Sequence, residues 1–497
     1  MKMFSAATVY PHGGYIFNSI ISERRKDNTD KRREGATVQM SNISEAEAAE
    51  AYYKKMTETP VSRLIVTLGI PTTVSMLISG IYNLADTYFV GTLGESPQAA
   101  TGILFTLQAI IQALAFMLGH GSGSFVSASL AEKNIKRASK YVSTAFFTGA
   151  VIGTLLSVFG IIFLSPFMRL LGSTDTILPY ARDYGLCVLI SCPFMICSLI
   201  LNNNLRYEGK AFYAMIGLTA GGVLNIFGDF LLIRVFSLGV LGAGISTAVS
   251  QLVSFIILFF WYCKMAQGTI SHRFISRSLK TYLSIIKVGF PSLIRQGLSS
   301  ISNGILNNLA KPFGDAAIAA LSVVGKYSSF IMCIGLGIGQ GFQPVSSFNY
   351  QAGKYRRVKR GLVFTTVFAF AAVGIIALLG MIFSEQIVNF FQKSESVVSI
   401  GSEALKYSSA GLIFFPISVP VNMLYQSIRR PGVSSILSLM RSGVIFIPLI
   451  FIMSHFFMLR GILLSQPLAD VASGLISIPF IFRFLHTAPD GDYTDTK

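Results

Sequence analysis

Charged residues are scarce in this sequence. Asp, Glu, Lys and Arg together make up 13% of its 497 residues, whereas ordinary soluble domains carry about 25%. Hydrophobic residues make up 52%, the mean hydropathy is +0.60, and the apolar residues come in blocks of roughly 20–30, separated by short polar breaks. This composition excludes an ordinary soluble protein. It predicts an all-α membrane protein whose chain crosses the lipid bilayer many times.

Cysteine is also rare, and its positions exclude a metal centre or a disulfide framework. The five cysteines lie in or beside apolar blocks and lack metal-ligand spacing, at Cys187, Cys192, Cys197, Cys263 and Cys333. We interpret them as small buried hydrophobic residues. The net charge of +17 is spread over particular loops instead of one face or tail, which argues against a nucleic-acid partner. We therefore expect neither a cofactor nor bound nucleic acid.

Sequence motifs for enzymes and ATP-driven pumps are missing. The glycine-rich stretches "GHGSGSF" and "GLGIGQG" do not lie between a strand and a helix, and neither contains the Lys-Ser/Thr pair of a nucleotide-binding loop. They favour close helix packing instead. The sequence has no HExxH motif, no nucleophile beside a histidine and no paired acids at a cytoplasmic interface. We expect a protein that is not an enzyme and that takes its energy from an ion gradient.

The polar blocks divide the chain into five parts. Residues 1–60 contain the mixed-charge run "SERRKDNTDKRREG", and we expect a cytoplasmic, largely disordered extension, with Met40 or Met56 as alternative start sites. Twelve helices are predicted after it, at 62–93, 98–131, 139–171, 179–204, 211–236, 240–264, 282–312, 316–352, 359–391, 399–427, 433–458 and 461–486. They form an N-terminal lobe at 61–265 and a C-terminal lobe at 282–486. A cytoplasmic linker at 266–281 joins the lobes, and a tail covers 487–497.

Lys and Arg concentrate in the loops that follow even-numbered helices, as in "EKNIKRASK" after the second helix and "GKYRRVKR" after the eighth. The loops after odd-numbered helices, such as "GTLGESPQ", have almost none. Basic loops stay on the cytoplasmic side of a membrane. Both termini are therefore expected in the cytoplasm of a bacterial cell, with the chain in the inner or plasma membrane.

An internal repeat relates the two lobes. "LGIPTTVSMLISGIYNLADTYFVGTLG" and "VGFPSLIRQGLSSISNGILNNLAKPFG" share Gly, Pro, Ser and Asn positions at an offset of 220 residues. Each lobe has an even number of helices, so both lobes enter the membrane from the same side. They are then related by a pseudo-two-fold axis along the membrane normal, as in transporters that work by alternating access.

Polar side chains inside the N-terminal lobe predict an ion site. Asp86 lies in the first helix, Asn225 and Asp229 share one face of the fifth, and Thr247 lies in the sixth. Asp86, Asp229 and Thr247 each lie about 10 Å below the outer surface, judged by a rise of 1.5 Å per residue. An acid inside a membrane costs on the order of 3 kcal/mol and is usually functional. Two acids, an amide and a hydroxyl at one depth suit H+ or an oxygen-liking cation such as Na+.

These motifs carry a family resemblance. From about Thr59 to Leu485 the chain resembles the multidrug and toxic compound extrusion family, and most of all its MepA-like bacterial branch, through "NLADTYFVGTLG", "NIFGD", "GQGFQPVSSFNYQAGKYRRVKRG" and "QPLADVASG". The resemblance implies an antiporter that exports lipophilic, often cationic, compounds in exchange for H+ or Na+. It also implies that Asp86, Asn225, Asp229 and Thr247 form the coupling-ion site. We expect a monomer in the lipid bilayer.

The C-terminal lobe lacks acids at the matching positions, because Asp86 corresponds to Leu306 and Asp229 to Ile452. Its own acid, Asp470, is either a packing or gating partner or a participant in transport. Other polar residues with secondary roles to consider are Lys326, Arg295, Asn303 and His120. We expect Lys326 or Arg295 to pair with Asp470, to line the cavity or to extend to a membrane interface.

A second function stays open at this stage, namely a flippase or exporter of a lipid-linked or metabolite substrate on a related fold. Such a protein would favour a basic cavity for a pyrophosphate group, whereas the polar core predicted here is acidic.

Overall fold

The computed structural model describes residues 47–391 and 394–489, and the long elements in these ranges are all helices. The N-terminal lobe contains α2 (Val61–Gly91), α3 (Glu95–Ala131), α4 (Ile135–Ile162), α5 (Leu164–Leu170), α6 (Leu178–Tyr207), α7 (Ala211–Asp229), the π-helix η1 (Phe230–Val235) and α8 (Gly239–Met265). The short 3-10 helix η2 (His272–Phe274) lies in the linker. These bounds follow the predicted spans within several residues, because long apolar runs dictate helices in a bilayer.

The C-terminal lobe repeats this pattern with more breaks. It contains α9 (Leu279–Ala310), the 3-10 helix η3 (Lys311–Phe313), α10 (Asp315–Gln351), α11 (Tyr355–Ile382), α12 (Ser384–Phe391), α13 (Glu395–Leu412), α14 (Phe415–Ser427), α15 (Pro431–Leu439), the π-helix η4 (Met440–Val444) and α16 (Phe446–Thr487). The predicted single helix 399–427 is two helices, α13 and α14, bent by 44°. Pro416, at the start of α14, lies beside the break.

Twelve crossings follow from these helices. Nine described helices are long and apolar enough to span a membrane, and the bent pair α13–α14 adds a tenth. Residues 431–487 count as one of the nine, yet Met458 has a non-helical backbone with φ of 51°, so the chain reverses there and provides two crossings. The helix α9, with 32 residues, completes the set. The predicted twelve-helix, two-lobe fold is confirmed.

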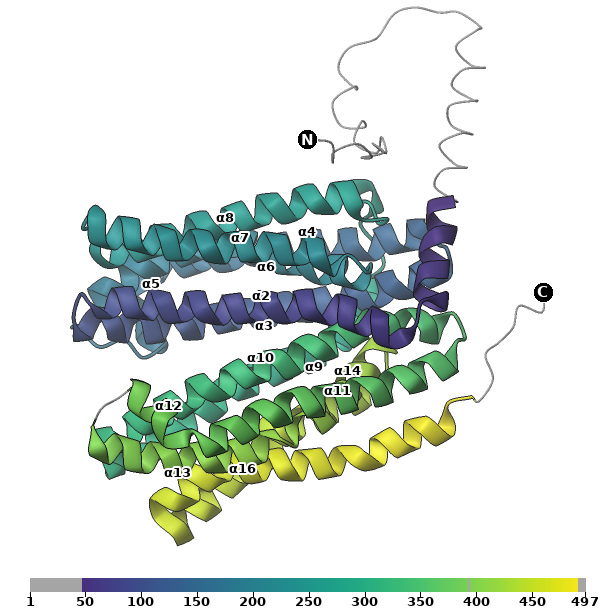
Figure 1. Cartoon of the computed structure of the whole chain (residues 1–497). Helices are drawn as coiled ribbons and strands as arrows, with labels where there is room; N and C mark the ends of the chain where they lie inside the picture. The colour runs from purple at the N-terminus through teal and green to yellow at the C-terminus, as the bar shows by residue number, and fades with distance from the viewer. Residues whose placement is uncertain (1–46, 392–393, 490–497) are drawn as a thin grey trace, which may run out of the picture.

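The two lobes pack side by side and meet along two helix pairs, α2 with α10 and α3 with α9 (Figure 1). Glycine permits this close approach. A Cβ on Gly121 would lie 2.1 Å from the carbonyl oxygen of Ile285, and a Cβ on Gly341 would lie 3.0 Å from that of Ile65. Gly341 is 220 positions after Gly121, and Ile285 is 220 positions after Ile65. In the first contact the glycine belongs to the N-terminal lobe, and in the second it belongs to the C-terminal lobe. This reciprocity is what a pseudo-two-fold axis requires. The glycine-rich stretches therefore serve helix packing, as predicted.

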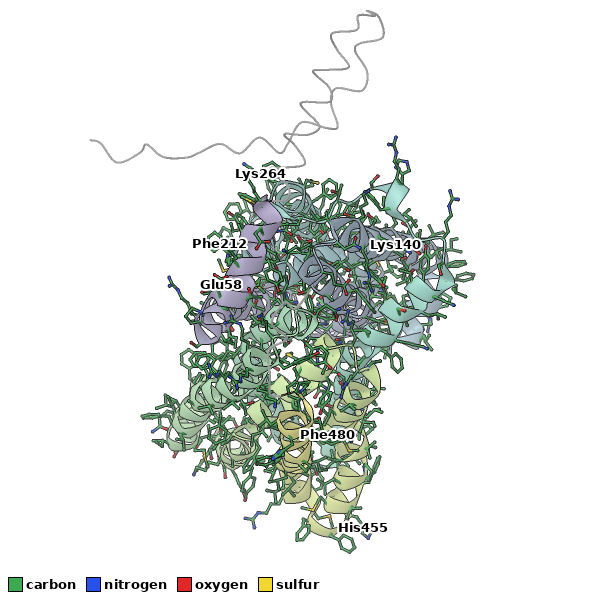
Figure 2. The ribbon with its side chains drawn as sticks, turned by 90° about the vertical axis from the view of Figure 1, so that its right-hand side faces the viewer. Glu58, Lys140, Phe212, Lys264, His455 and Phe480 are labelled. Atoms are coloured by element: carbon green, nitrogen blue, oxygen red, sulfur yellow. The ribbon has the colours of Figure 1, made fainter. Side chains whose placement is uncertain are left out.

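Contacts between the lobes concentrate at the end of the bundle that carries the basic loops. There the Ser124 hydroxyl donates to the carbonyl oxygen of Ser427 at 2.8 Å, and the Ser347 hydroxyl donates to that of Ser124 at 3.0 Å. Figure 2 looks onto this end, with Glu58, Lys140 and Lys264 around the N-terminal lobe and Phe480 in the C-terminal lobe. At the midpoints of α10 and α2 the Cys333 thiol lies 3.8 Å from the backbone oxygen of Met76, and among the described residues no hydrogen bond joins these two helices on the outer side of that contact.

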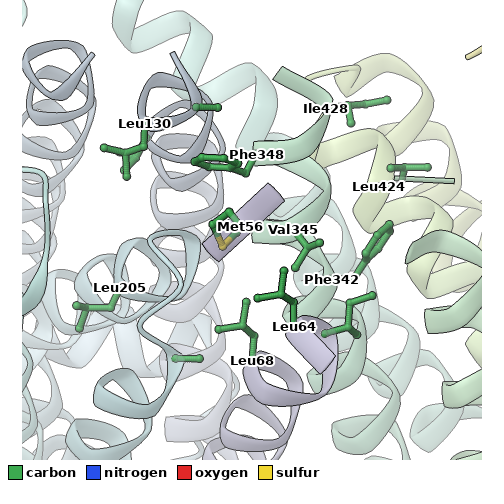
Figure 3. Close-up of a cluster of buried hydrophobic side chains, with 14 of the residues drawn as sticks. Met56, Leu64, Leu68, Leu130, Leu205, Phe342, Val345, Phe348, Leu424 and Ile428 are labelled. Atoms are coloured by element: carbon green, nitrogen blue, oxygen red, sulfur yellow. The ribbon is translucent and has the colours of Figure 1, made fainter. Parts of the chain in front are cut away.

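The structure describes the last part of the predicted extension, residues 47–60. Residues 47–58 form a helix across the basic end of the bundle (Figure 1). Its Tyr52 and Met56 are buried in a hydrophobic cluster with Leu64 and Phe348, so this helix joins both lobes (Figure 3). The rest of the extension, residues 1–46, and the end of the tail, residues 490–497, lie outside the described residues.

Candidate functional site

Asp86 lies in the outer half of α2, on the side that faces the N-terminal lobe. Its side chain is 4% exposed. The hydroxyl of Tyr184, from α6, donates to its Oδ2 atom at 2.9 Å. The same hydroxyl lies 3.1 Å from Oγ1 of Thr247 in α8. Tyr184 therefore connects two of the four predicted residues.

The other two residues come from the end of α7. Asn225 donates from Nδ2 to Oγ1 of Thr247 at 3.1 Å. The Ser246 hydroxyl donates to the backbone oxygen of Asn225 at 2.9 Å, which fixes α8 against α7. Asp229 is the last residue of α7 and is completely buried. The helix continues as the π-helix η1, a local change of winding that is frequent at functional sites.

These hydrogen bonds leave several oxygen atoms of the site without a partner among the described residues. They are Oδ1 of Asp86, Oδ1 of Asn225 and both carboxylate oxygens of Asp229. No ion pair within the described ranges includes Asp86 or Asp229. Buried oxygen atoms without donors are costly. A proton or a Na+ ion would satisfy them, because carboxylate and amide oxygens are the ligands that hard cations prefer.

Sequence reasoning missed Tyr184 and Ser246 because a hydroxyl in a membrane helix usually serves packing. Depth would have indicated Tyr184, which lies six residues after the start of α6 at Leu178. This is close to the depth calculated for the other three helices. Ser246 adjoins Thr247 in sequence, but the two residues project at different angles from α8, and only the structure shows that both contact Asn225.

Asp470 has a partner that the sequence did not indicate. Nε of Arg441, in η4, donates to its Oδ1 atom at 2.6 Å, and Nε2 of Gln466 donates to the same atom at 3.0 Å. Of the three alternatives considered for Lys326 and Arg295, pairing with Asp470 is therefore not observed. Lys326 is exposed on α10, and Arg295 on α9 lines a cavity of the C-terminal lobe. Asn303 is exposed and joins no site.

His120 lies between the lobes and is completely buried. Its Nε2 atom faces Nη2 of Arg206 at 3.4 Å, and its Nδ1 atom lies 2.8 Å from the hydroxyl of Ser292. Because a guanidinium only donates hydrogen bonds, Nε2 is the acceptor, and Nδ1 carries the proton and donates to Ser292. Arg206 also donates to Gln340 across the lobe boundary. The histidine thus belongs to an interlobe network, away from the Asp86 site.

Comparisons with known proteins agree with this architecture. A family model described as MatE matches residues 71–231 and again residues 291–452, once in each lobe. The multidrug export protein MepA of Staphylococcus saprophyticus is 26% identical over 418 residues, which cover 83% of this chain and 92% of that protein. MepA of Staphylococcus aureus strain N315 is 25% identical over 435 residues, covering 87% and 95%.

A solved structure is similar over both lobes. It is described as the outward-facing conformation of a multidrug resistance MATE family transporter of the MOP superfamily. It has a TM-score of 0.82 and 23% sequence identity, and the match covers 87% of this chain and 98% of that chain. The likeness extends to the fold of the whole bundle.

Proposed function

Because this chain belongs to the MatE family, we propose that it is a multidrug efflux antiporter that exports lipophilic, often cationic, compounds across a bacterial cell membrane. Its relatives named as multidrug export proteins match over more than nine-tenths of their length. Transport by alternating access, in exchange for H+ or Na+, fits two lobes that meet at one end of the bundle. Because basic loops stay on the cytoplasmic side of a membrane, we propose that this end of the bundle and both termini face the cytoplasm.

The observation that supports ion coupling is the group of buried oxygen atoms around Asp86 and Asp229. Two carboxylates that share a site without a cationic side chain attract a proton or a metal cation strongly. We assign Asp86, Asn225, Asp229 and Thr247 to the coupling-ion site, with Tyr184 positioning Asp86 and Thr247. When the ion leaves, the unpaired oxygen atoms again favour uptake of H+ or Na+. The N-terminal lobe therefore has an ion-bound and an ion-free state, and antiport alternates between them.

Ethidium efflux from proteoliposomes tests this function, with a pH gradient and a Na+ gradient imposed separately. Transport in response to one gradient identifies the coupling ion, and transport with neither contradicts the antiporter. Asp86→Asn and Asp229→Asn should each abolish gradient-driven efflux, because asparagine keeps the size of the side chain and removes its charge. The matched control is Asp175→Asn, an exposed acid paired with Arg169 on the surface, which should transport at the wild-type rate.

One observation favours the second candidate function, export of a lipid-linked or metabolite substrate. Two arginines, Arg295 and Arg441, line the cavity of the C-terminal lobe. The acidic polar core that argued against an anionic substrate is confined to the N-terminal lobe. An anionic compound that drives exchange in the same proteoliposomes, while ethidium does not, would favour this candidate.

A further inference from the structure

A cavity lies inside the C-terminal lobe, enclosed by α9, α10, α14 and the α15–η4 segment. Apolar side chains form much of its wall, among them Met332, Leu336 and Phe415. Arg295 from α9 and Arg441 from η4 are the two charged residues of the lining. The cavity thus combines an apolar surface with a pair of guanidinium groups.

The two arginines differ in how far their charges are neutralised. Arg441 is paired with Asp470 at 2.6 Å, and its guanidinium carbon lies 4.6 Å from the ring centre of Phe415. Arg295 is half-buried, and no carboxylate in the described ranges lies within ion-pair distance of it. Its hydrogen bond to Oδ1 of Asn422 is 3.5 Å long, at the limit of such a contact. Two cations and one anion leave the cavity one net positive charge.

A guanidinium inside a membrane protein is costly unless an anion accompanies it. Its planar fork of N–H donors matches the two oxygen atoms of a carboxylate. One net charge balances a monoanion, whereas a pyrophosphate group carries at least two negative charges. The ion site of the N-terminal lobe has the opposite composition, because Asp86 and Asp229 are both carboxylates and neither is in an ion pair with a described residue. The lobes therefore differ in the sign of the group that each can hold.

We propose that this cavity is a substrate subsite that binds the carboxylate of an amphiphilic compound. Arg295 is the anchoring cation, and Met332, Leu336 and Phe415 contact the apolar body of the compound. Arg441 is paired with Asp470 and forms the part of the cavity wall beside Phe415. The proposal rests on the proposed export function and names the residue of the C-terminal lobe that recognises the carboxylate of a substrate.

A pair of dyes tests the subsite by equilibrium binding to the purified full-length protein in lipid nanodiscs. Rhodamine 110 has a carboxylate, and rhodamine 123 is its methyl ester with the same aromatic body. The wild type should bind rhodamine 110 more tightly in fluorescence anisotropy titrations. Arg295→Gln should reduce this preference at least about tenfold, because a hydrogen-bonded ion contact is lost. Arg295→Lys should keep part of it, since the charge remains without the fork.

Lys326→Gln is the matched control, because Lys326 is an exposed cation of the same lobe outside the cavity. It should leave the preference for rhodamine 110 unchanged. The wild type provides a second measurement that needs no variant: benzoate should displace rhodamine 110 at concentrations at which neutral benzamide does not. An unchanged preference in Arg295→Gln, an equal loss in Lys326→Gln or equal displacement by both competitors would overturn the subsite. These measurements use no gradient, so failure of ethidium efflux would leave their result standing.

Discussion

At the scale of single residues, Tyr184 shows how a neutral group can organise a charged site. Its hydroxyl donates to Asp86 and lies within hydrogen-bond distance of Thr247, so one side chain of α6 aligns ligands from α2 and α8. Because the aromatic ring is buried in the packed core of the lobe, removal of the hydroxyl alone should leave the helices in place. The effect of that removal then reports on the site and not on the fold.

We predict that Tyr184→Phe shifts the concentration of driving ion needed for half-maximal ethidium efflux about tenfold. If H+ drives transport, that concentration should fall, because the hydroxyl donates to the charged carboxylate of Asp86 and so opposes its protonation. If Na+ drives transport, it should rise, because Asp86 and Thr247 are no longer aligned by one hydroxyl. A hydrogen bond to a charged group contributes about 1.5–3 kcal/mol, and 1.4 kcal/mol corresponds to a factor of ten. Initial rates at a series of Na+ concentrations and pH values provide the measurement. Tyr180→Phe, on the exposed side of the same helix, is the control. An unchanged ion dependence in Tyr184→Phe would assign the hydroxyl to packing.

A second residue of interest lies outside the membrane spans, at the basic end. Glu208 follows α6 and is completely buried; it accepts hydrogen bonds from the Tyr262 hydroxyl at 2.9 Å and the backbone N–H of Gln267 at 2.5 Å. Burial raises the pKa of Glu208 from 4.5 to about 7, although these hydrogen bonds and the charge of Lys210 oppose the shift. The carboxylate fixes the start of the interlobe linker to the N-terminal lobe.

The raised pKa of Glu208 predicts that the protein loses stability as pH rises. The folded state holds this proton more tightly than the unfolded chain, so the contribution of Glu208 is most favourable below pH 4.5 and declines through pH 7. A difference of about 2.5 pKa units corresponds to roughly 3 kcal/mol. Unfolding temperatures in detergent between pH 5 and pH 8 should fall more steeply for the wild type than for Glu208→Gln. Parallel curves would show that Glu208 does not titrate in this range.

At the scale of helices, most of the fold could be predicted because each helix that crosses a bilayer must be long and apolar. A span needs about 20 apolar residues, and runs of that length were visible in the sequence, as was the repeat at 220 residues. The bend between α13 and α14 and the π-helices η1 and η4 were not visible. They depend on how one helix packs against another, which a single apolar run does not encode.

The acids of the candidate site could also be predicted from the apolar runs, whereas the partner of Asp470 could not. Asp86 and Asp229 are conspicuous because acids are rare in apolar helices. Arg441 was not identified from the sequence, and counting depth would have separated it from Asp470. Arg441 lies 17 residues before the reversal at Met458, and Asp470 lies 12 residues after it. This is a difference of about 8 Å along the helices. The long side chain of arginine spans that difference, which residue counting does not take into account.

The Arg441–Asp470 pair fastens η4 to the second half of α16, and a double-mutant cycle should reveal its contribution. Asp470→Asn leaves a guanidinium without its carboxylate, and removal of one partner of a buried pair costs about 3–5 kcal/mol. The unfolding temperature should fall in this variant and recover largely in Asp470→Asn/Arg441→Gln. Additive losses would show that the pair is not coupled.

In transport, Asp470→Asn should be milder than Asp86→Asn or Asp229→Asn, because the lobe has no acid at either matching position. Gradient-driven ethidium efflux in proteoliposomes measures this order. Complete loss of coupling in Asp470→Asn, with Asp86→Asn still active, would reverse the assignment of the ion site to the N-terminal lobe.

At the scale of the whole molecule, the helix formed by residues 47–58 acts as a bridge between the lobes. The Tyr52 ring packs edge-on against Phe348 at 5.4 Å, and Nδ2 of Asn349 donates to the backbone oxygen of Met56 at 3.1 Å. Nη2 of Arg357 donates to the backbone oxygen of Thr59 at 2.5 Å. The helix at residues 47–58 could be predicted from the sequence pattern only in part. Its apolar residues at 52 and 56 share one face, but they stand among charges typical of a solvated segment.

Two truncations separate this helix from the sequence before it. Removal of residues 1–39 should change neither membrane insertion nor ethidium efflux, because that stretch has no helix-length apolar run and its basic residues are interspersed with acids. Attraction to anionic lipid, about 1 kcal/mol for each basic residue near the surface, is then offset in part by those acids.

Removal of residues 1–58 also deletes Tyr52 and Met56 from the hydrophobic cluster. Loss of a buried methionine side chain alone costs about 2–5 kcal/mol. The longer truncation should therefore lower the unfolding temperature and slow efflux, whereas equal behaviour of both proteins would show that the bridge is dispensable.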